Sequence, residues 1–274
     1  MKNTIDRRAL MGLAALAAAA PAFAQDASDA HRRVMTSSDP TLPDPNAPKV
    51  AMLIYPKMVA IDLIGPLSVF TVARWNIQLI WKDKAPLATD VGVSIAANTT
   101  FAESYADPDI LFVPGGLMGT IACMQDPAVI DFVASRGARA KWVASDCTGS
   151  LILGAAGLLE GYDATSHWAV ADLLPLLGAR HVDKRVVRDR NRFTAGGATA
   201  GIDLGLVLVA ALDGEETSRR DQLILEYAPE PPFHNGTPAE AGPERVAAMR
   251  KRRVWMDQQA RLATEAARRK LNPG

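Results

Sequence analysis

Cys147 is the residue whose type and setting point most directly to chemistry. It lies in S-D-C-T-G-S, residues 145–150, between an apolar run that predicts a buried strand and a helix that begins near Thr148. A thiol at a helix N-terminus meets unpaired N–H groups and the positive end of the helix dipole, which favour the thiolate. Such a strand-to-helix turn is typical of a nucleophile elbow. The alternative is a buried structural cysteine, against which the polar neighbours Asp146 and Thr148 argue.

A second segment holds backbone groups that such a nucleophile would need. Residues 113–116, V-P-G-G, follow another apolar run, and their glycines expose N–H groups of the kind that form an oxyanion hole. By itself the segment is equally typical of a plain turn. Together with the amide of Thr148, these groups would hold negative charge on a substrate attacked by Cys147.

Asp62 is the third candidate. It follows the first predicted strand and lies among Ile61, Leu63 and Ile64. A carboxyl group in apolar surroundings tends to have a raised pKa, which suits it to proton transfer. The alternative is an N-terminal cap for a helix that begins near Pro66.

Alternating strands and helices position these segments. Short apolar runs predict strands, and apolar positions at helical spacing predict helices. This alternation predicts one α/β domain with a mostly parallel sheet, helices on both faces, and chemistry at the carboxyl ends of the strands. The predicted strands are 50–55, 77–81, 91–95, 110–113, 142–145 and 182–187, and the predicted helices are 127–137, 148–156 and 202–212.

Composition excludes several classes of function. The 274 residues are 49% apolar and 22% charged, enough for one substantial core. Thirty basic and thirty acidic residues give a formal net charge of zero, without the basic excess of a nucleic-acid-binding protein. Two cysteines are too few for a disulfide scaffold or a four-cysteine zinc site. With no phosphate-binding glycine motif and no His/Cys cluster, we expect neither a metal nor another cofactor.

The first 24 residues are predicted to be an export signal of the twin-arginine (Tat) type. Arg7-Arg8 precedes the apolar run 9–20, and Ala22-Phe23-Ala24 is a small-x-small cleavage site. As a helix the run would span only about 18 Å, too little for a bilayer. We therefore expect a periplasmic protein, with an uncleaved membrane anchor as the alternative. Residues 25–48 are predicted to be a polar, Pro-rich leader without a helix.

Taken together, these segments resemble the ThiJ/PfpI superfamily, and within it the isonitrile hydratase branch. The resemblance extends from about Lys49 to Val246 and implies a flavodoxin-like α/β sandwich that forms a homodimer. It implies a catalytic domain over residues 49–246, followed by a basic helical tail over 247–274. The motifs that carry it are A-I-D-L-I-G-P-L-S-V-F, I-L-F-V-P-G-G, C-T-G-S-L-I-L-G-A-A-G-L-L-E-G-Y-D-A-T-S-H-W, R-N-R-F-T-A-G-G-A-T-A-G-I-D-L-G-L and E-Y-A-P-E-P-P-F-H-N-G-T-P.

The resemblance implies catalytic roles for three residues. Cys147 matches the nucleophile, Asp62 the acid/base, and Thr148 a further residue of the hydratase site. The implied reaction adds water to an isonitrile and gives an N-substituted formamide. Cys147 attacks the isonitrile carbon, Asp62 protonates it, and water activated by Asp62 then hydrolyses the covalent thioimidate. This chemistry needs no cofactor.

The resemblance also implies residues that contact the substrate. Gly115 and Gly116 match the anion-stabilising turn. His167, in the H-W pair, is expected to contact substrate, with packing under the nucleophile turn as the alternative. Residues 231–233, P-P-F, are expected to line the pocket or a dimer contact.

Other functions remain open at this stage. One is amidase, peptidase or carbonyl-repair chemistry at Cys147, although a peptidase would need a histidine base where Thr148 stands. Another is a non-catalytic ligand-binding or redox-sensing module, as in the sensory halves of transcription regulators. The basic stretch 244–274 predicts one solvated helix, with contact to an anionic membrane surface as a minor alternative. We discount DNA binding by this tail, because a helix-turn-helix needs at least two helices and the stretch predicts one.

Two acidic or thiol neighbours bear on the nucleophile. Asp146 is acidic where relatives mostly carry an apolar residue, and a like charge pointing inward would raise the pKa of Cys147. A disulfide between Cys123 and Cys147 would silence the site in an oxidising compartment. The expected separation of strand ends argues against that bond.

Overall fold

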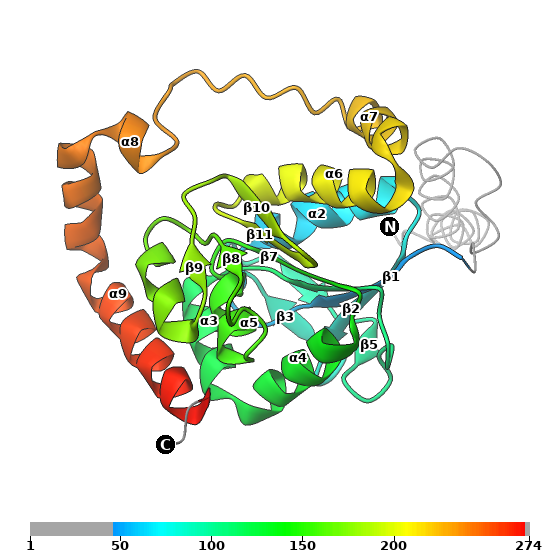
Figure 1. The fold of residues 1–274 in the computed structure, drawn as a ribbon, viewed down its shortest axis with the longest axis horizontal. Coiled ribbons are helices and arrows are strands. Elements are labelled where there is room, and N and C mark those ends of the chain that lie inside the picture. Colours follow the sequence, from blue (N-terminus) through cyan, green and yellow to red (C-terminus); the bar gives the residue numbers. More distant parts are fainter. Residues whose placement is uncertain (1–45, 272–274) are drawn as a thin grey trace, which may run out of the picture. The chain divides into compact units, whose positions relative to one another are not determined.

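A seven-stranded sheet organises residues 46–271, the part of the chain that the computed structural model describes. These residues belong to one compact unit, and the strand order is β10-β11-β7-β6-β1-β2-β5 (Figure 1). Every neighbouring pair is parallel except β10–β11, which confirms the predicted α/β class. The strands are β1 (Lys49–Leu53), β2 (Asn76–Trp81), β5 (Thr99–Thr100), β6 (Ile110–Val113), β7 (Trp142–Asp146), β10 (Val186–Asp189) and β11 (Arg192–Ala195).

Helices cover both faces of this sheet. One face carries α2 (Ala60–Val72) and α6 (Ala200–Asp213), which pack on each other, and α7 (Glu215–Ile224) beside them (Figure 1). The other carries α3 (Leu117–Gln125), α4 (Pro127–Arg139), α5 (Gly149–Ala155) and the 3-10 helix η1 (Ala171–Leu177). Because helices bury it on both sides, β1 is apolar at consecutive positions instead of alternating.

Two small sheets and one short helix complete the elements. β3 (Pro86–Ala88) pairs antiparallel with β4 (Ser94–Ala96), and β8 (Asp163–Ala164) pairs with β9 (Arg180–His181). The prediction of a strand over 91–95 was wrong in extent, because Gly92 lies in the turn and only β4, outside the main sheet, is extended. The strand predicted over 182–187 begins at Val186.

An exposed arm, residues 228–237, leads from α7 to the short helix α8 (Pro238–Ala241). In Figure 1 it runs as an extended chain between the two helices. Phe233 within it is 77% exposed. The segment predicted to line the substrate pocket therefore lies open to solvent in this chain.

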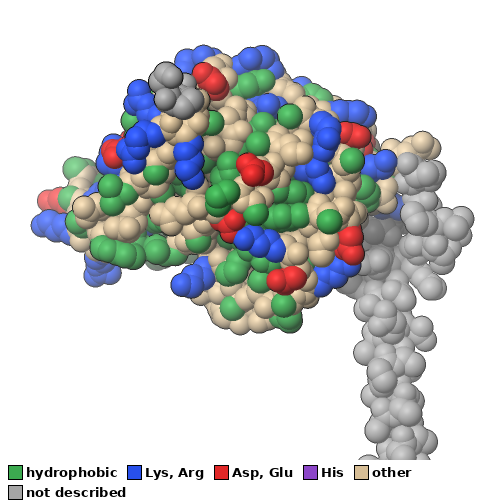
Figure 2. Space-filling model, turned by 90° about the horizontal axis from the view of Figure 1, so that it is seen from below, with side chains coloured by type: hydrophobic (Ala, Val, Ile, Leu, Met, Phe, Trp, Pro, Cys, Tyr) green, Lys and Arg blue, Asp and Glu red, His purple; other side chains and the backbone are tan. Residues whose placement is uncertain are grey.

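The basic tail is a single helix, α9 (Pro243–Leu271), as predicted, although it begins four residues before the expected boundary at 247. The prediction that it is solvated holds only in part, because Arg250 and Arg253 of its first half are partly covered as well. Ala260, Ala263 and Ala267 are buried, and the helix packs on α3, α5 and η1. On the face shown in Figure 2, Lys and Arg side chains are interspersed with acidic and apolar ones.

The predicted export signal and nearly all of the leader fall in residues 1–45, outside the described part of the chain. Within residues 46–271 no single helix combines the length and apolar composition of a membrane span. The consecutive helices α3 and α4 reach that composition only when counted together, across a 90° bend.

Candidate active site

The carboxyl ends of β1, β6 and β7, which are neighbours in the sheet, bring the predicted residues together. The Gly115 amide, just after β6, donates to Asp62 Oδ2 on α2 at 3.1 Å. The next amide, Gly116, donates to Thr148 Oγ1 beside the nucleophile at 2.9 Å. Cys147, Asp62, Thr148 and the two glycines thus form one cluster.

Cys147 occupies the first position after β7, in a left-handed conformation with φ +54°. Non-glycine residues adopt this region at a cost, so surrounding contacts must hold it. The Cys147 amide donates to Ala195 O at 3.0 Å, and its carbonyl accepts from Ser150 Oγ at 3.3 Å and Ser166 Oγ at 3.0 Å. This is the geometry of the predicted nucleophile elbow.

Asp62 lies in the first turn of α2, at its third residue, and is fully buried. The alternative of a helix cap at Asp62 is wrong, since the helix begins at Ala60 and contains Pro66. The carboxyl group reaches across to the Gly115 amide instead of capping its own helix.

Gly115 sets the spacing between acid and nucleophile. A Cβ atom at this position would lie 2.6 Å from Asp62 Oδ2 and 2.7 Å from Cys147 Cβ. Both distances are below contact, so only glycine allows the carboxyl group to sit against the nucleophile turn.

The two glycine amides are engaged in this structure, by Asp62 and by Thr148. The expectation of free oxyanion donors needs correction in that respect. What Gly115 and Gly116 do here is orient the acid and the threonine. A substrate anion would have to exchange with one of these bonds.

Thr148 belongs to a buried chain of hydroxyl groups that the sequence did not reveal. Its Oγ1 lies 2.8 Å from Thr120 Oγ1, which lies 3.2 Å from the Tyr55 hydroxyl, and that hydroxyl donates to Pro114 O. The only signal in the sequence is that Tyr55 and Thr120 are polar positions in otherwise apolar segments. The chain fixes the turn 113–116 beneath the site.

Burial controls the acid. It raises the pKa of Asp62 from 3.8 to about 7, against the lowering effects of the Cys147 thiol and the Gly115 amide. Asp62 Oδ1 is buried and accepts no hydrogen bond within residues 46–271. This oxygen is the one available for proton exchange with the thiol and with a bound molecule.

Burial also raises the pKa of Cys147 well above its ordinary value, and the neighbouring Asp62 and Asp146 carboxyl groups raise it further. In the free protein, burial therefore opposes the thiolate that the helix end is expected to favour. Cys147 is 6% exposed, so desolvation outweighs the helix dipole. The proton stays on sulfur until Asp62 takes it.

Asp146 points inward, which is the condition under which its charge affects Cys147. It is fully buried, and its Oδ1 accepts the Cys147 amide at 2.9 Å. Burial and the nearby Asp62 raise the pKa of Asp146 well above 3.8. Two such carboxyl groups do not ionise together readily, so Asp146 serves as a neutral clamp on the turn.

His167 faces α9. Burial lowers its pKa to about 4, with Arg253 and Arg250 of α9 lowering it further, and its Nδ1 accepts the Ala169 amide at 3.2 Å. The bond that reaches Cys147 from this segment comes from the preceding residue, Ser166. The structure thus fits the packing alternative for His167, and Ser166 is the residue that sequence reasoning missed.

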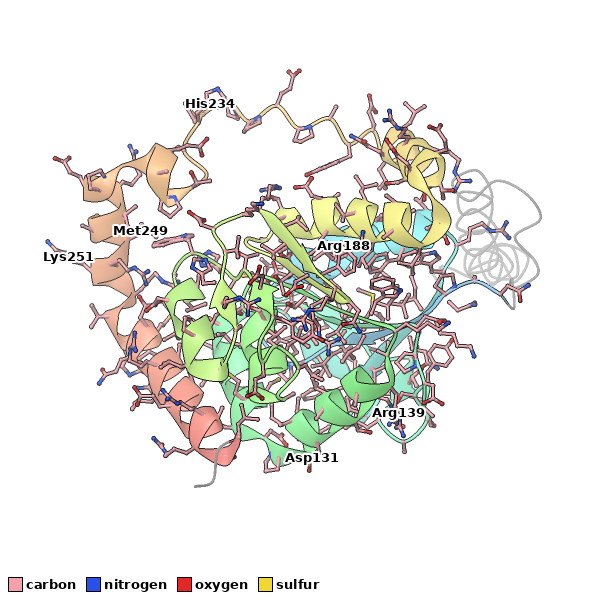
Figure 3. The ribbon with its side chains drawn as sticks, in the orientation of Figure 1. Asp131, Arg139, Arg188, His234, Met249 and Lys251 are labelled. Atoms are coloured by element: carbon pink, nitrogen blue, oxygen red, sulfur yellow. The ribbon has the colours of Figure 1, made fainter. Side chains whose placement is uncertain are left out.

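The residues 231–233 lie on the exposed arm, where Figure 3 labels the adjacent His234 far from the sheet. Within one chain these residues do not reach the Cys147 cluster, and their place in a pocket or a dimer contact stays a prediction.

The disulfide alternative is wrong as well. Cys123 and Cys147 are both free and buried. Burial raises the pKa of Cys123 to about 12. Within residues 46–271 no three His, Cys, Asp or Glu side chains are grouped as a metal site would require.

A sequence model of the DJ-1/PfpI family matches residues 48–211. The chain belongs to the DJ-1/PfpI family. It is 45% identical over 225 residues to an isonitrile hydratase of Pseudomonas putida, covering 82% of this chain and 98% of the relative. It is also similar to the crystal structure of a ThiJ/PfpI family protein from Pseudomonas syringae, with 41% identity, a TM-score of 0.78, and coverage of 83% of this chain and 97% of that one.

This chain is also similar, more distantly, to part of a transcription regulator. The HTH-type regulator CdhR of Pseudomonas aeruginosa is 30% identical over 158 residues, which is 56% of this chain and 45% of the regulator. The similarity therefore leaves out more than half of that protein.

Proposed function

We propose that this DJ-1/PfpI protein hydrates isonitriles to N-substituted formamides. The observation that carries the proposal is the pairing of Cys147 with a buried carboxyl group, Asp62, whose pKa lies near 7. A general acid/base works best when its pKa is close to the working pH. The similarity to the Pseudomonas putida isonitrile hydratase, over nearly the whole of that enzyme, points to the same substrate class.

The first step forms a bond between Cys147 Sγ and the isonitrile carbon. The thiol proton passes to Asp62, and Asp62 delivers it to the same carbon, which leaves a thioimidate, R–N=CH–S–Cys147. The sum is addition of S–H across the terminal carbon, so no oxidant or cofactor enters. An isonitrile presents a terminal carbon on a linear group, which suits a nucleophile that is only 6% exposed.

The second step consumes water. Ionised Asp62 takes a proton from water as the water oxygen attacks the thioimidate carbon, and Asp62 passes that same proton to the nitrogen. The resulting tetrahedral adduct, R–NH–CH(OH)–S–Cys147, collapses by breaking the C–S bond. Formamide leaves, and the proton returns to the Cys147–Asp62 pair.

A peptidase-like reaction is less well supported, because the histidine that the sequence offers, His167, faces α9. A regulatory role is less well supported because α9 is one continuous helix rather than a helix-turn-helix.

Mass spectrometry of reactions with a panel of alkyl and aryl isonitriles tests the proposal. The parent should yield the N-substituted formamide, and Cys147→Ala and Asp62→Asn should abolish it. Cys123→Ser is the matched control, because Cys123 is the other buried thiol and should leave the reaction intact. Absence of formamide from the folded parent would refute the proposal.

Two further features are proposed with it. The homodimer is supported by Ile61 and Ile64, which are 42% and 43% exposed on α2 on either side of Asp62.

Export is supported by the twin arginine and the cleavage site in residues 1–24. Periplasmic protein that begins at Gln25 by intact-mass analysis would bear out export, and uncut protein in the cytoplasm would refute it.

A further inference from the structure

The segment Ser166–Ala169, here called the support loop, is part of the connection between β8 and η1 and contacts the turn at Cys147. Ser166 is 3% exposed, and its hydroxyl donates to the Cys147 carbonyl at 3.0 Å. Just upstream, the Thr165 amide donates to Thr194 Oγ1 at 2.8 Å, which anchors the loop to the sheet. The position of the Cys147 carbonyl therefore depends on the position of this loop.

That dependence matters because of the conformation of Cys147. A non-glycine residue with φ +54° keeps this geometry only while its neighbours hold it. Ser150 and Ser166 are the two side chains that hold its carbonyl. Ser150 lies on α5, directly after the turn, so the helix fixes its position. Ser166 lies on the support loop, so its hydrogen bond to Cys147 depends on where that loop is held.

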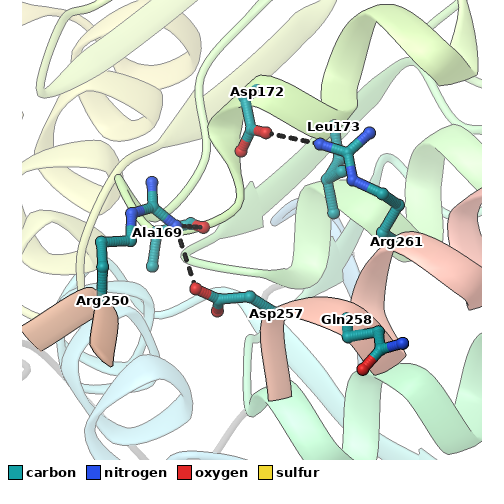
Figure 4. A pocket seen from close by; sticks show the side chains of 7 residues that line it. All are labelled: Ala169, Asp172, Leu173, Arg250, Asp257, Gln258 and Arg261. Carbon is teal, nitrogen blue, oxygen red and sulfur yellow. Dashed lines mark hydrogen bonds and ion pairs between the residues drawn. The ribbon is translucent and has the colours of Figure 1, made fainter. Parts of the chain in front are cut away.

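Arg250 of α9 holds the other end of the support loop. Its guanidinium donates to the carbonyls of Trp168, at 3.3 Å, and Ala169, and it lies over the Trp168 ring, 5.0 Å from the centroid. Asp257, two turns further along the same face of α9, accepts a hydrogen bond from Arg250 Nη1 at 3.1 Å and so fixes the guanidinium (Figure 4). A planar donor that meets two adjacent carbonyls restrains the loop in a way that a lysine cannot.

An ion pair between α9 and η1 keeps the helix next to this loop. Arg261 Nη2 lies 3.0 Å from Asp172 Oδ2 at the start of η1, and both line a cavity of about 320 Å³ together with Arg250 and Asp257 (Figure 4). The family model ends at residue 211, so α9 and its arginines lie outside the part of the chain that the family model matches.

We propose that Arg250 is a positioning residue for the nucleophile: through the support loop and Ser166 it holds the Cys147 carbonyl, and with it the thiol. The effect on the thiol stands independently of the substrate. The effect on turnover rests on the proposed isonitrile hydration.

The test compares Arg250→Ala with Lys251→Ala in the full chain. Lys251 is the next residue on α9 and is exposed, with its side chain directed away from the body in Figure 3. Alkylation of each cysteine by iodoacetamide is followed at fixed pH by peptide mass spectrometry. Cys123 serves as the internal reference for general loosening of α9, since it is 3% exposed on α3 and lines a pocket together with Trp255 and Gln259 of α9.

Arg250→Ala should accelerate alkylation of Cys147 by roughly tenfold and leave Cys123 within about twofold, the size expected for one lost coupling. Lys251→Ala should change neither rate. In the hydration assay, Arg250→Ala should lower kcat with little change in KM. An unchanged alkylation rate at Cys147 would overturn the inference. Equal acceleration at Cys147 and Cys123 would overturn it too, because it would show that the variant loosens the protein as a whole.

A double-mutant cycle with Ser166→Ala tests the route. If Arg250 acts through Ser166, Arg250→Ala should have little further effect once the Ser166 hydroxyl is gone, whereas additive effects would overturn the route. Should Arg250→Ala fail to fold, Arg250→Lys decides, since it keeps the charge beside Asp257 and loses the paired carbonyl contacts. A changed Cys147 rate in a protein that makes no formamide would sink the proposed function and leave this inference standing.

Discussion

Asp62 determines the pH range in which the site works. The reactive state of the Cys147–Asp62 pair holds one proton, on sulfur, while Asp62 is ionised and able to accept it. Below the pKa of Asp62, about 7, the carboxyl group is already protonated and cannot take the thiol proton. The proton inventory belongs to the pair rather than to either residue alone.

We therefore expect kcat/KM for isonitrile hydration to rise with pH through about 7 and to fall again where the pair loses its last proton. Initial rates across a pH series measure this. A profile that is flat through neutral pH would show that Asp62 is not the group that titrates.

The same carboxyl group makes the fold sensitive to pH. Its pKa is 3.8 in an unfolded chain and about 7 in the folded one, so the folded state binds the extra proton between those values. Stability is therefore fullest below about pH 4 on account of this group, and is lost as pH rises towards 7, by on the order of 4 kcal/mol.

Asp62→Asn removes that titration. The free energy of unfolding of the variant minus that of the parent should grow as pH rises from about 5 to 7 and level off above. Urea denaturation at a series of pH values gives both quantities. A constant difference over this range would mean that Asp62 is not protonated in the folded protein.

At the scale of elements, the turn after β6 is tight enough that one methyl group should disable the site. Gly115→Ala places a carbon 2.6 Å from Asp62 Oδ2. We expect hydration to fall by roughly a hundredfold and stability by about 1–3 kcal/mol, from displacement of the acid and overpacking.

Gly197→Ala is the matched control for this prediction, because an added Cβ there meets no atom within 4 Å. It should leave both hydration and the unfolding midpoint unchanged. Equal loss in the two variants would show that any alanine in these turns is harmful, and the spacing argument for Gly115 would fail.

Elements were predictable where one physical signal dominates. The strands β1, β6 and β7 are consecutive apolar runs because helices bury them on both faces. Asp62 was harder, because Pro66 looks like a helix start although it is the seventh residue of α2. Ser166 carries no local pattern, and Tyr55 and Thr120 only show as polar positions in apolar segments. Only the tertiary fold brings their hydroxyls to the turns at 113–116 and 147.

For the whole molecule, the exposed isoleucines of α2 bear on assembly. A dimer that covers Ile61 and Ile64 would also cover the helix that carries Asp62. We expect Ile64→Glu to convert a dimer into a monomer, because a charge in an apolar contact is costly to desolvate.

Sedimentation equilibrium of the parent and of Ile64→Glu measures this change. Val91→Glu is a control, since Val91 is 67% exposed in the β3–β4 hairpin rather than on α2. A parent that sediments as a monomer, or a variant that stays dimeric, would rule out this face as the contact.

The exposed arm determines how the protein responds to proteolysis. Residues 228–237 lie open to solvent. Beyond them, α9 is docked by its buried alanines, by the hydrogen bonds of Arg250 to the support loop, and by the ion pair between Arg261 and Asp172 of η1. A protease that nicks the arm would sever the covalent link and leave α9 seated as a separate peptide. In the intact chain the arm is a tether that keeps the local concentration of α9 high. Once the arm is cut, α9 would dissociate only when the protein is diluted.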